Sequence, residues 1–184
     1  MCRQWYDSSL DPKECNVSDL NFPRSRAADR QFVLGSQLRA AILTTGAETD
    51  GRHDLTERIA PPGSWTPLHL HTRYDERFWV ISGSMTVWSG QDTVVLRSGD
   101  FYAAPMGVPH TIETGPDGCH ALNISSPAGF AELIARAGTP AHLATADTEF
   151  DAELFAAVAA ELGDVILGPP GMIPADLPDD AQHR

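Results

Sequence analysis

Short runs rich in β-branched and aromatic residues follow one another along residues 31–126, separated by Gly, Pro, Asp and Ser. Runs of this length are typical of strands. Their close spacing predicts an all-β sandwich or barrel instead of alternating strands and helices. The expected strands are LRAAILTT, HDLTERIA, SWTPLHLH, ERFWVIS, SMTVWS, DTVVLR, DFYAAP, HTIET and HALNIS.

The hydrophobic pattern changes to a helical period after this region. We expect a first helix in which Ser126 is the N-cap, Pro127 is the first helical residue and Gly138 marks the end. Its apolar stripe consists of Phe130, Leu133, Ile134 and Ala137.

A second helix is expected further along the chain. Thr148 and Asp151 resemble a capping box, and Gly163 ends the helix. The segment DVILGPPG that follows is predicted to be extended. The apolar stripe of this helix consists of Leu154, Phe155, Val158 and Leu162.

These patterns divide the chain into four parts. Residues 1–30 have no sustained period and are expected to form an N-terminal arm. Residues 31–126 are expected to form the barrel and residues 127–168 a helical extension. The prolines and aspartates of residues 169–184 predict a flexible tail.

Composition narrows the classes of partner. A formal net charge of −12 repels phosphate backbones and anionic lipid, so we expect a small-molecule ligand, no nucleic acid and no membrane. The N-terminus lacks the apolar run of a signal peptide, and no segment has the ~20 apolar residues of a membrane span, so a cytoplasmic protein is expected. Cys2, Cys15 and Cys119 are expected to be free thiols.

Three histidines and one glutamate have the spacing of a metal site. His69 and His71 alternate with Leu70, so both point to one face of a strand with Cα atoms roughly 6.5 to 7 Å apart. Four residues allow a turn before Glu76, which opens the next strand and can add a carboxylate oxygen. His110 follows a segment rich in Gly and Pro and completes the expected set of four ligands.

Two spaced motifs contain these residues. The pattern G-x5-H-x-H-x4-E-x6-G is complete from Gly63 to Gly83. The pattern G-x5-P-x-G-x2-H-x3-N runs from Gly99, with Thr114 in place of the final Asn. Over residues 35–126 the chain therefore resembles the cupin superfamily, and its C-terminal part resembles bacterial single-domain cupins that are quercetin 2,3-dioxygenase-like. The resemblance implies a double-stranded β-helix, or jelly-roll barrel, followed by helices.

The ligand types indicate a reactive centre. Three imidazoles and one carboxylate leave one or two positions open on a divalent transition-metal ion, which these residue types allow to be Fe, Ni, Mn, Co or Zn. In the dioxygenases that the chain resembles, an enol or phenol oxygen of the substrate binds the metal, the glutamate can act as a base and O2 adds to the ring. The resemblance gives Glu76 both roles, as ligand and as base.

Strand parity suggests which side chains line a substrate pocket. Phe78 and Val80 share a face with Glu76, and Ile112 and Thr114 share one with His110. Ordinary core packing is an equally good interpretation of each. Trp65, Trp88, Tyr102 and Met106 are further candidates for an aromatic rim.

The opposite face of the same strand carries apolar side chains. Trp79 and Ile81 point away from the expected site. An apolar outer face must be covered by the terminal helices or by a second subunit, and we expect a homodimer.

Three functions remain open at this point. The first is a metal-dependent dioxygenase acting on a flavonol-like or other enolisable aromatic molecule. The second is a non-redox cyclase, isomerase or dehydratase of natural-product metabolism, in which the metal is a Lewis acid. The third is a small-molecule-binding cupin without turnover.

Overall fold

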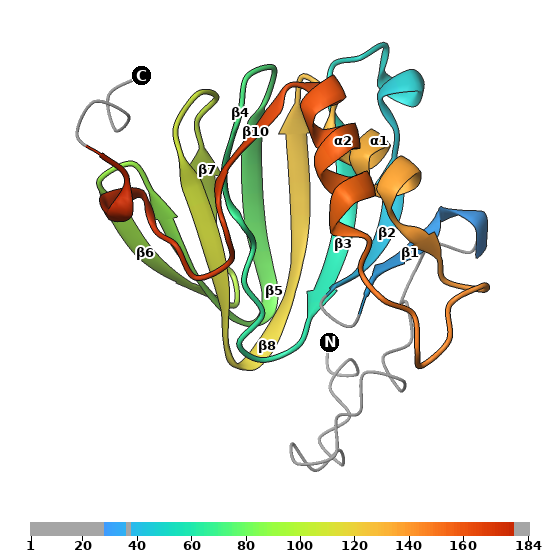
Figure 1. Cartoon of the computed structure of the whole chain (residues 1–184), viewed down its shortest axis with the longest axis horizontal. Helices are drawn as coiled ribbons and strands as arrows, with labels where there is room; N and C mark the ends of the chain where they lie inside the picture. Colours follow the sequence, from blue (N-terminus) through green and yellow to red (C-terminus); the bar gives the residue numbers. More distant parts are fainter. Residues whose placement is uncertain (1–27, 36–37, 179–184) are drawn as a thin grey trace, which may run out of the picture.

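The β-rich region folds into one antiparallel sheet that curls into a barrel in the computed structural model, which describes residues 28–35 and 38–178 (Figure 1). Almost all of the expected arm lies outside the described residues, together with Cys2 and Cys15. The strands are β1 Gln31–Leu34, β2 Leu38–Thr44, β3 Asp54–Ala60, β4 Leu68–His71, β5 Asp75–Ser89, β6 Asp92–Arg97, β7 Phe101–Ala104, β8 His110–Ser126, β9 Thr139–Pro140 and β10 Asp164–Gly168.

Strands β5 and β8 organise the barrel. β5 pairs with β6, β7 and β8, while β8 also pairs with β3 and β4, so these two strands belong to both walls. The remaining order is β10-β4-β8-β3-β2-β1-β9. The predicted all-β jelly-roll fold with C-terminal helices is confirmed.

Both long strands join segments that the sequence pattern separates. ERFWVIS and SMTVWS are parts of β5, and HTIET and HALNIS are parts of β8. The β5–β8 register shifts at Val80/Ser82 and again at Gly83/Met85. Gly83 has φ 73°, and a Cβ added there would lie 2.2 Å from the carbonyl oxygen of Gly118. This glycine therefore bends a continuous strand instead of ending it.

Helix α1 spans Phe130–Ala137 and begins later than predicted. Ser126 is the last residue of β8, so it is not the N-cap, and Pro127 precedes the helix. The first backbone N–H groups are capped from another strand, because Oδ2 of Asp54 accepts hydrogen bonds from N–H of Gly129 and Ala131 at 2.7 and 3.1 Å. The predicted end at Gly138 is confirmed.

Helix α2 spans Ala152–Leu162 and is capped by Asp151 alone, whose side chain accepts from N–H of Leu154 at 2.8 Å. The predicted capping box is wrong, because the Thr148 hydroxyl accepts from N–H of Thr145. Gly163 ends the helix as expected, in the left-handed conformation.

The buried face of α2 differs from the predicted stripe. Leu154 is 43% exposed, so it is not a core residue. Val158 and Ala159 are buried, and Phe155 and Leu162 pack partly against the same cluster.

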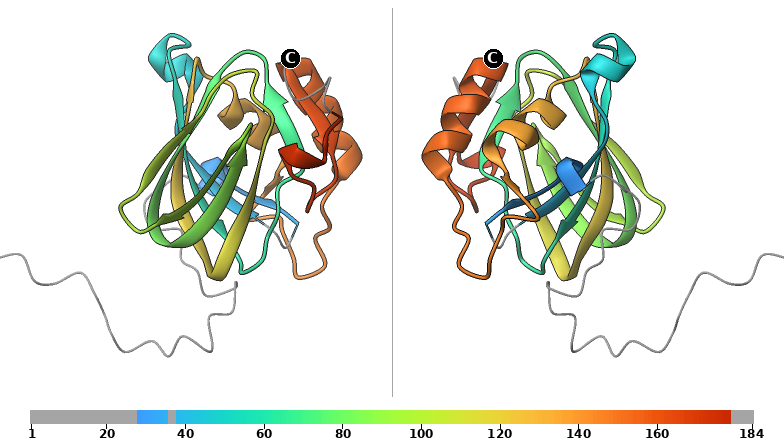
Figure 2. Two further views of the ribbon diagram at one scale, coloured as in Figure 1. Left: turned by 90° about the vertical axis from the view of Figure 1, so that its left-hand side faces the viewer. Right: turned by 90° about the vertical axis from the view of Figure 1, so that its right-hand side faces the viewer.

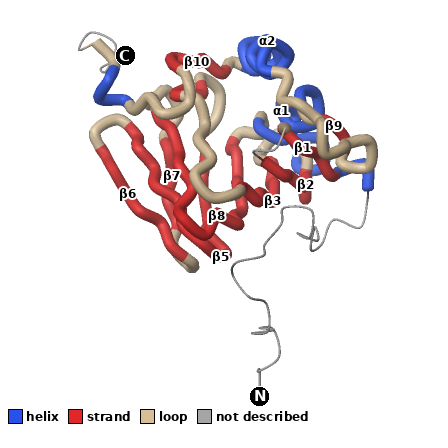
Figure 3. The backbone as a smooth tube through the Cα atoms, turned by 60° about the horizontal axis from the view of Figure 1, so that its bottom comes forward, coloured by secondary structure: helices blue, strands red, loops and turns tan. Residues whose placement is uncertain are grey.

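Two apolar clusters stabilise the molecule. One joins α1 and α2 to the barrel strands and includes Phe32, Ile42 and Ile134. The second fills the barrel interior around Phe78 and Val87. Both helices lie on one side of the barrel, as the side views and the tube trace show (Figures 2 and 3). Helix α1 packs on β1–β3, and α2 packs on α1 and β10.

The chain returns to the barrel after α2. β10 pairs with β4, so that Asp164 lies beside His71. Beyond it, Pro174–Asp176 form a 3-10 turn and Leu177 is buried. Pro174 is buried as well, while the flexibility of residues 169–184 stays a prediction.

The outer face of β5 is not covered by the helices. Trp79 is 52% exposed and Ile81 is 41% exposed among the described residues. Coverage by a second copy, and thus the homodimer, stays a prediction. Within residues 28–35 and 38–178, no helix has the length and apolar character needed to cross a bilayer.

Candidate metal centre

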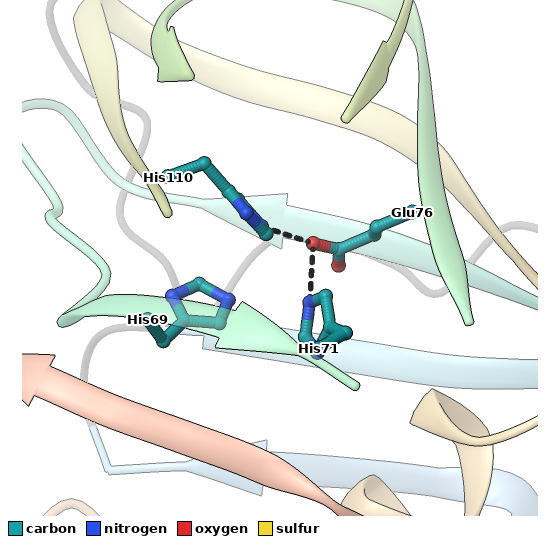
Figure 4. Close-up of side chains that lie close together, drawn as sticks. All are labelled: His69, His71, Glu76 and His110. Atoms are coloured by element: carbon teal, nitrogen blue, oxygen red, sulfur yellow. Dashed lines mark hydrogen bonds and ion pairs between the residues drawn. The ribbon is translucent and has the colours of Figure 1, made fainter. Parts of the chain in front are cut away.

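Four side chains converge at one end of the barrel interior (Figure 4). His69 and His71 come from β4, Glu76 from the start of β5, and His110 from the first position of β8. One potential ligand atom from each lies within 4.8 Å of all the others. The sequence pattern thus predicted a real cluster, and strand pairing creates it by placing His69 opposite His110.

All three histidines present the same ring nitrogen to the centre. Nδ1 of His69 lies 2.7 Å from the carbonyl oxygen of Pro67, and Nδ1 of His110 lies 3.0 Å from that of Val108. Nδ1 of His71 lies 2.7 Å from Oδ1 of Asp164. Because these oxygens accept, each Nδ1 carries the hydrogen, and Nε2 keeps its lone pair in the neutral ring.

A carboxylate oxygen meets two of those nitrogens. Oε2 of Glu76 lies 3.1 Å from Nε2 of His71 and 3.1 Å from Nε2 of His110. Lone pairs that face one another at this distance need a proton or another cation between them. Glu76 is 2% exposed and His110 is fully buried, so the compensating charge must lie within the cluster itself, as a proton or as a metal ion. This donor set fits a divalent transition-metal ion.

The pKa values of the metal-free cluster reflect the same charge pairing. Burial lowers the pKa of His71, but its hydrogen bonds to Asp164 and Glu76 outweigh burial and raise the pKa to about 9. Burial raises the pKa of Glu76, but hydrogen bonds from His110 and His71 dominate and hold it well below its ordinary value. Burial, and then the charges of His110 and His71, hold the pKa of His69 well below its ordinary value.

Asp164 is a member of the site that sequence analysis did not find. It follows Gly163 at the end of α2 and is 4% exposed. Its second oxygen accepts a hydrogen bond from the Tyr74 hydroxyl at 3.1 Å, and the Tyr74 ring stacks on His71. Asp164 lies 93 residues from His71, so no local spacing connects them. The one available signal is a carboxylate directly after a helix-ending glycine.

A cavity of about 180 Å³ opens beside the cluster. His69, His71 and Glu76 form one wall of it. The other walls are mostly apolar and come from the barrel, both helices and β10. They include Leu38, Phe130, Leu133, Phe155 and Ile166.

Some of the predicted pocket residues line this cavity. Trp65, Ile112 and Thr114 do so. Trp65 stacks on Trp88 with ring centroids 5.0 Å apart, which places Trp88 behind it. The Thr114 hydroxyl accepts from N–H of Ser64 at 2.9 Å, so this residue fixes the loop before β4.

The other candidates lie elsewhere. Phe78 and Val80 are fully buried in the barrel core. Strand parity thus predicted that they point inward, but they pack against other core residues and do not line the cavity. Tyr102 packs against the same core, with its hydroxyl 3.4 Å from Asp92. Met106 is 45% exposed outside the cavity.

The family profile described as "Cupin domain" matches residues 56–125, which contain all four converging side chains. Residues 56–125 therefore contain a cupin domain. Two curated relatives of this cupin are each named quercetin 2,3-dioxygenase. The protein from Bacillus subtilis is 24% identical over 110 residues, or 60% of this chain and 32% of the relative. The protein from Aspergillus japonicus is 35% identical over 117 residues, or 61% of this chain and 31% of the relative. This cupin therefore spans about a third of the length of these relatives.

Two solved structures are also similar to part of the chain. KdgF from Halomonas sp. is 18% identical with a TM-score of 0.48, over 53% of this chain and 84% of that one. The polyketide cyclase RemF from Streptomyces resistomycificus is 26% identical with a TM-score of 0.44, over 50% of this chain and 67% of that one.

Proposed function

We propose that this cupin is a metal-dependent dioxygenase that acts on an enolisable aromatic small molecule. The ligands of its ion are His69, His71, Glu76 and His110. The observation that carries the proposal is the convergence of three Nε2 lone pairs and one carboxylate oxygen at the wall of an apolar cavity.

A divalent ion held by these four residues would act as a Lewis acid toward a substrate oxygen and O2. The protein supplies the proton acceptor. Oε2 of Glu76 faces the histidines, which leaves Oε1 to take the proton of a substrate hydroxyl. The apolar walls keep water from the reacting atoms, and Trp65 and Phe130 orient a flat ring.

Two arguments support oxygen chemistry and refine the substrate. The names of the curated relatives support a dioxygenase, although the match covers only about a third of each relative. The cavity of about 180 Å³ lies below the ~300 to 1,000 Å³ of sites for drug-sized molecules. A substrate with one or two rings therefore fits better than a three-ring flavonol.

Oxygen uptake tests the proposal. Protein reconstituted separately with Fe, Ni, Mn, Co or Zn is mixed with flavonols and with smaller phenols and enols. We expect substrate-dependent O2 consumption, lost in His71→Ala and retained in His142→Ala, which alters an exposed histidine outside the cluster. Conversion at the same rate without O2 contradicts the dioxygenase and indicates a non-redox cyclase, isomerase or dehydratase. Binding without any conversion indicates a non-catalytic cupin.

A further inference from the structure

Arg58 carries a positive charge into the cavity. It lies on β3, where Asp54, Thr56 and Ala60 share its inward face and Leu55 lies on the outer one. The hydrophobic pattern of this strand is thus inverted, with polar groups inside. Burying polar side chains in this way lowers the stability of the fold unless they form hydrogen bonds or ion pairs.

The contacts of Arg58 are few. Its Nη1 lies 3.9 Å from Oε1 of Glu76, which is an ion pair but too long for a hydrogen bond. Its guanidinium carbon lies 5.6 Å from the ring centroid of Phe130. Among the described residues, no acceptor lies within hydrogen-bonding distance of its side chain, although that side chain is only 12% exposed.

This leaves donors without acceptors. A guanidinium has five N–H groups in a planar fork, and the fork matches the two oxygens of a carboxylate. Arg58 lines the cavity, so the fork is accessible to a ligand there. Glu76 cannot fully satisfy it, because Oε2 of Glu76 faces His71 and His110.

The surroundings define the rest of the ligand. The cavity next to Arg58 is bounded by the rings of Trp65, Phe130 and Phe155. The candidate metal centre lies next to Arg58, because Glu76 belongs to the four converging residues and also forms the ion pair with Arg58. A ligand that contacts all of these groups has a flat apolar body for the rings and a carboxylate for the guanidinium. A third oxygen near the carboxylate would face the four-residue cluster.

We propose that Arg58 determines specificity for small, flat carboxylic acids, whose carboxylate pairs with the guanidinium while the ring packs against Phe130 and Trp65. This substrate class refines the proposed function. The selectivity in binding does not depend on dioxygenase activity, whereas turnover of the bound acid rests on the proposed function. Neutral molecules of the same shape leave the Arg58 donors unpaired and bind more weakly.

A matched pair of probes tests the inference without knowledge of the substrate. Isothermal titration calorimetry compares 2-naphthoate with 2-naphthamide on full-length protein loaded with Zn, which is redox-inert. We expect the naphthoate to bind about tenfold or more tightly, as charge-assisted hydrogen bonds predict. Equal affinities in the wild type overturn the proposal, and that comparison needs no variant.

Variants then assign the preference to Arg58. In Arg58→Met the preference should vanish, with naphthamide affinity and zinc content unchanged. Arg58→Lys should keep part of the preference, because it keeps the charge but loses the fork. Arg97→Met removes an exposed positive charge on β6 and should keep the full preference.

Two results contradict the assignment. A preference that survives in Arg58→Met shows that the carboxylate binds the zinc instead. Loss of zinc from Arg58→Met shows that Arg58 only holds Glu76. A failed oxygen-uptake experiment leaves the selectivity for acids in place, so the two proposals fail separately.

Discussion

Oδ1 of Asp164 lies 2.7 Å from Nδ1 of His71, and this contact links the C-terminal extension to the candidate metal centre. The two residues are also paired in register between β10 and β4. A carboxylate on Nδ1 fixes the ring orientation and makes Nε2 a stronger donor to a metal. The helical extension is therefore part of the site as well as a cover for the barrel.

Replacing Asp164 should weaken metal binding. In Asp164→Asn the charge is lost but the contact can remain, whereas Asp164→Ala loses both and leaves the Tyr74 hydroxyl without its acceptor. We expect the affinity to fall about 10- to 100-fold, with the larger loss in the alanine variant. Competition with a chelating dye measures it. Glu153→Gln, an exposed change in α2, is the control. Unchanged affinity in both Asp164 variants contradicts an orienting role.

Protons and metal should compete for His71. Its pKa is about 9 in the metal-free fold against an ordinary value of 6.5, so the stability that its charged form adds is complete below pH 6.5 and is lost as the pH rises to 9. Metal-free protein should therefore lose about 1 to 3 kcal/mol across this range.

Metal binding should strengthen over the same range, up to about tenfold per pH unit, because His71 must release a proton to bind the ion. Thermal unfolding after chelation and metal titration at several pH values test both trends. His71→Gln is the reference variant and should show neither the pH dependence of stability nor that of metal affinity. A wild type whose pH trends match those of the variant would rule out His71 as the competing group.

Spacing predicted the four converging residues because strand alternation and short turns are local rules. The sequence analysis did not predict Arg58 or Asp164 as site residues, for different reasons. Arg58 alternates with Leu55 and Ile59 along its strand, so the hydrophobic pattern gives no reason to expect its side chain in the interior. Asp164 reaches His71 only through the β10–β4 pairing, and no local rule predicts that pairing.

The helix starts show a similar limit. Ser126 has the right chemistry for an N-cap, but β8 continues through it to pair with Asp75. The cap comes from Asp54, 75 residues away from Gly129. Tertiary contacts thus replaced a local cap that the sequence offered.

Gly83 should be irreplaceable for a steric reason. A Cβ at this position would lie 2.2 Å from the Gly118 carbonyl oxygen, in addition to a positive φ of 73°. Gly63 has a similar φ of 67° but open space around the Cβ position. We expect Gly63→Ala to cost about 1 to 2 kcal/mol and Gly83→Ala at least ~3 kcal/mol, by urea unfolding. Equal losses of stability in Gly63→Ala and Gly83→Ala would contradict a steric role for the close contact between Gly83 on β5 and Gly118 on β8.

Ile134 should be the residue of α1 that contributes most to stability. It is fully buried between the helices and the barrel, so Ile134→Ala should destabilise the fold by about 2 to 5 kcal/mol. Leu154→Ala on α2 is the matched control and should cost less than ~1 kcal/mol, because Leu154 is 43% exposed. Similar losses in both variants would show that α1 is not packed as described.

Metal content is the most direct test of the central claim that His69, His71, Glu76 and His110 hold one ion. Elemental analysis of purified full-length protein after metal loading and desalting gives the ratio of metal to chain. We expect about one transition-metal ion per chain in the wild type and in His142→Ala, and strong loss in His71→Ala and His110→Ala. The same low metal content in the wild type and in His71→Ala would contradict it.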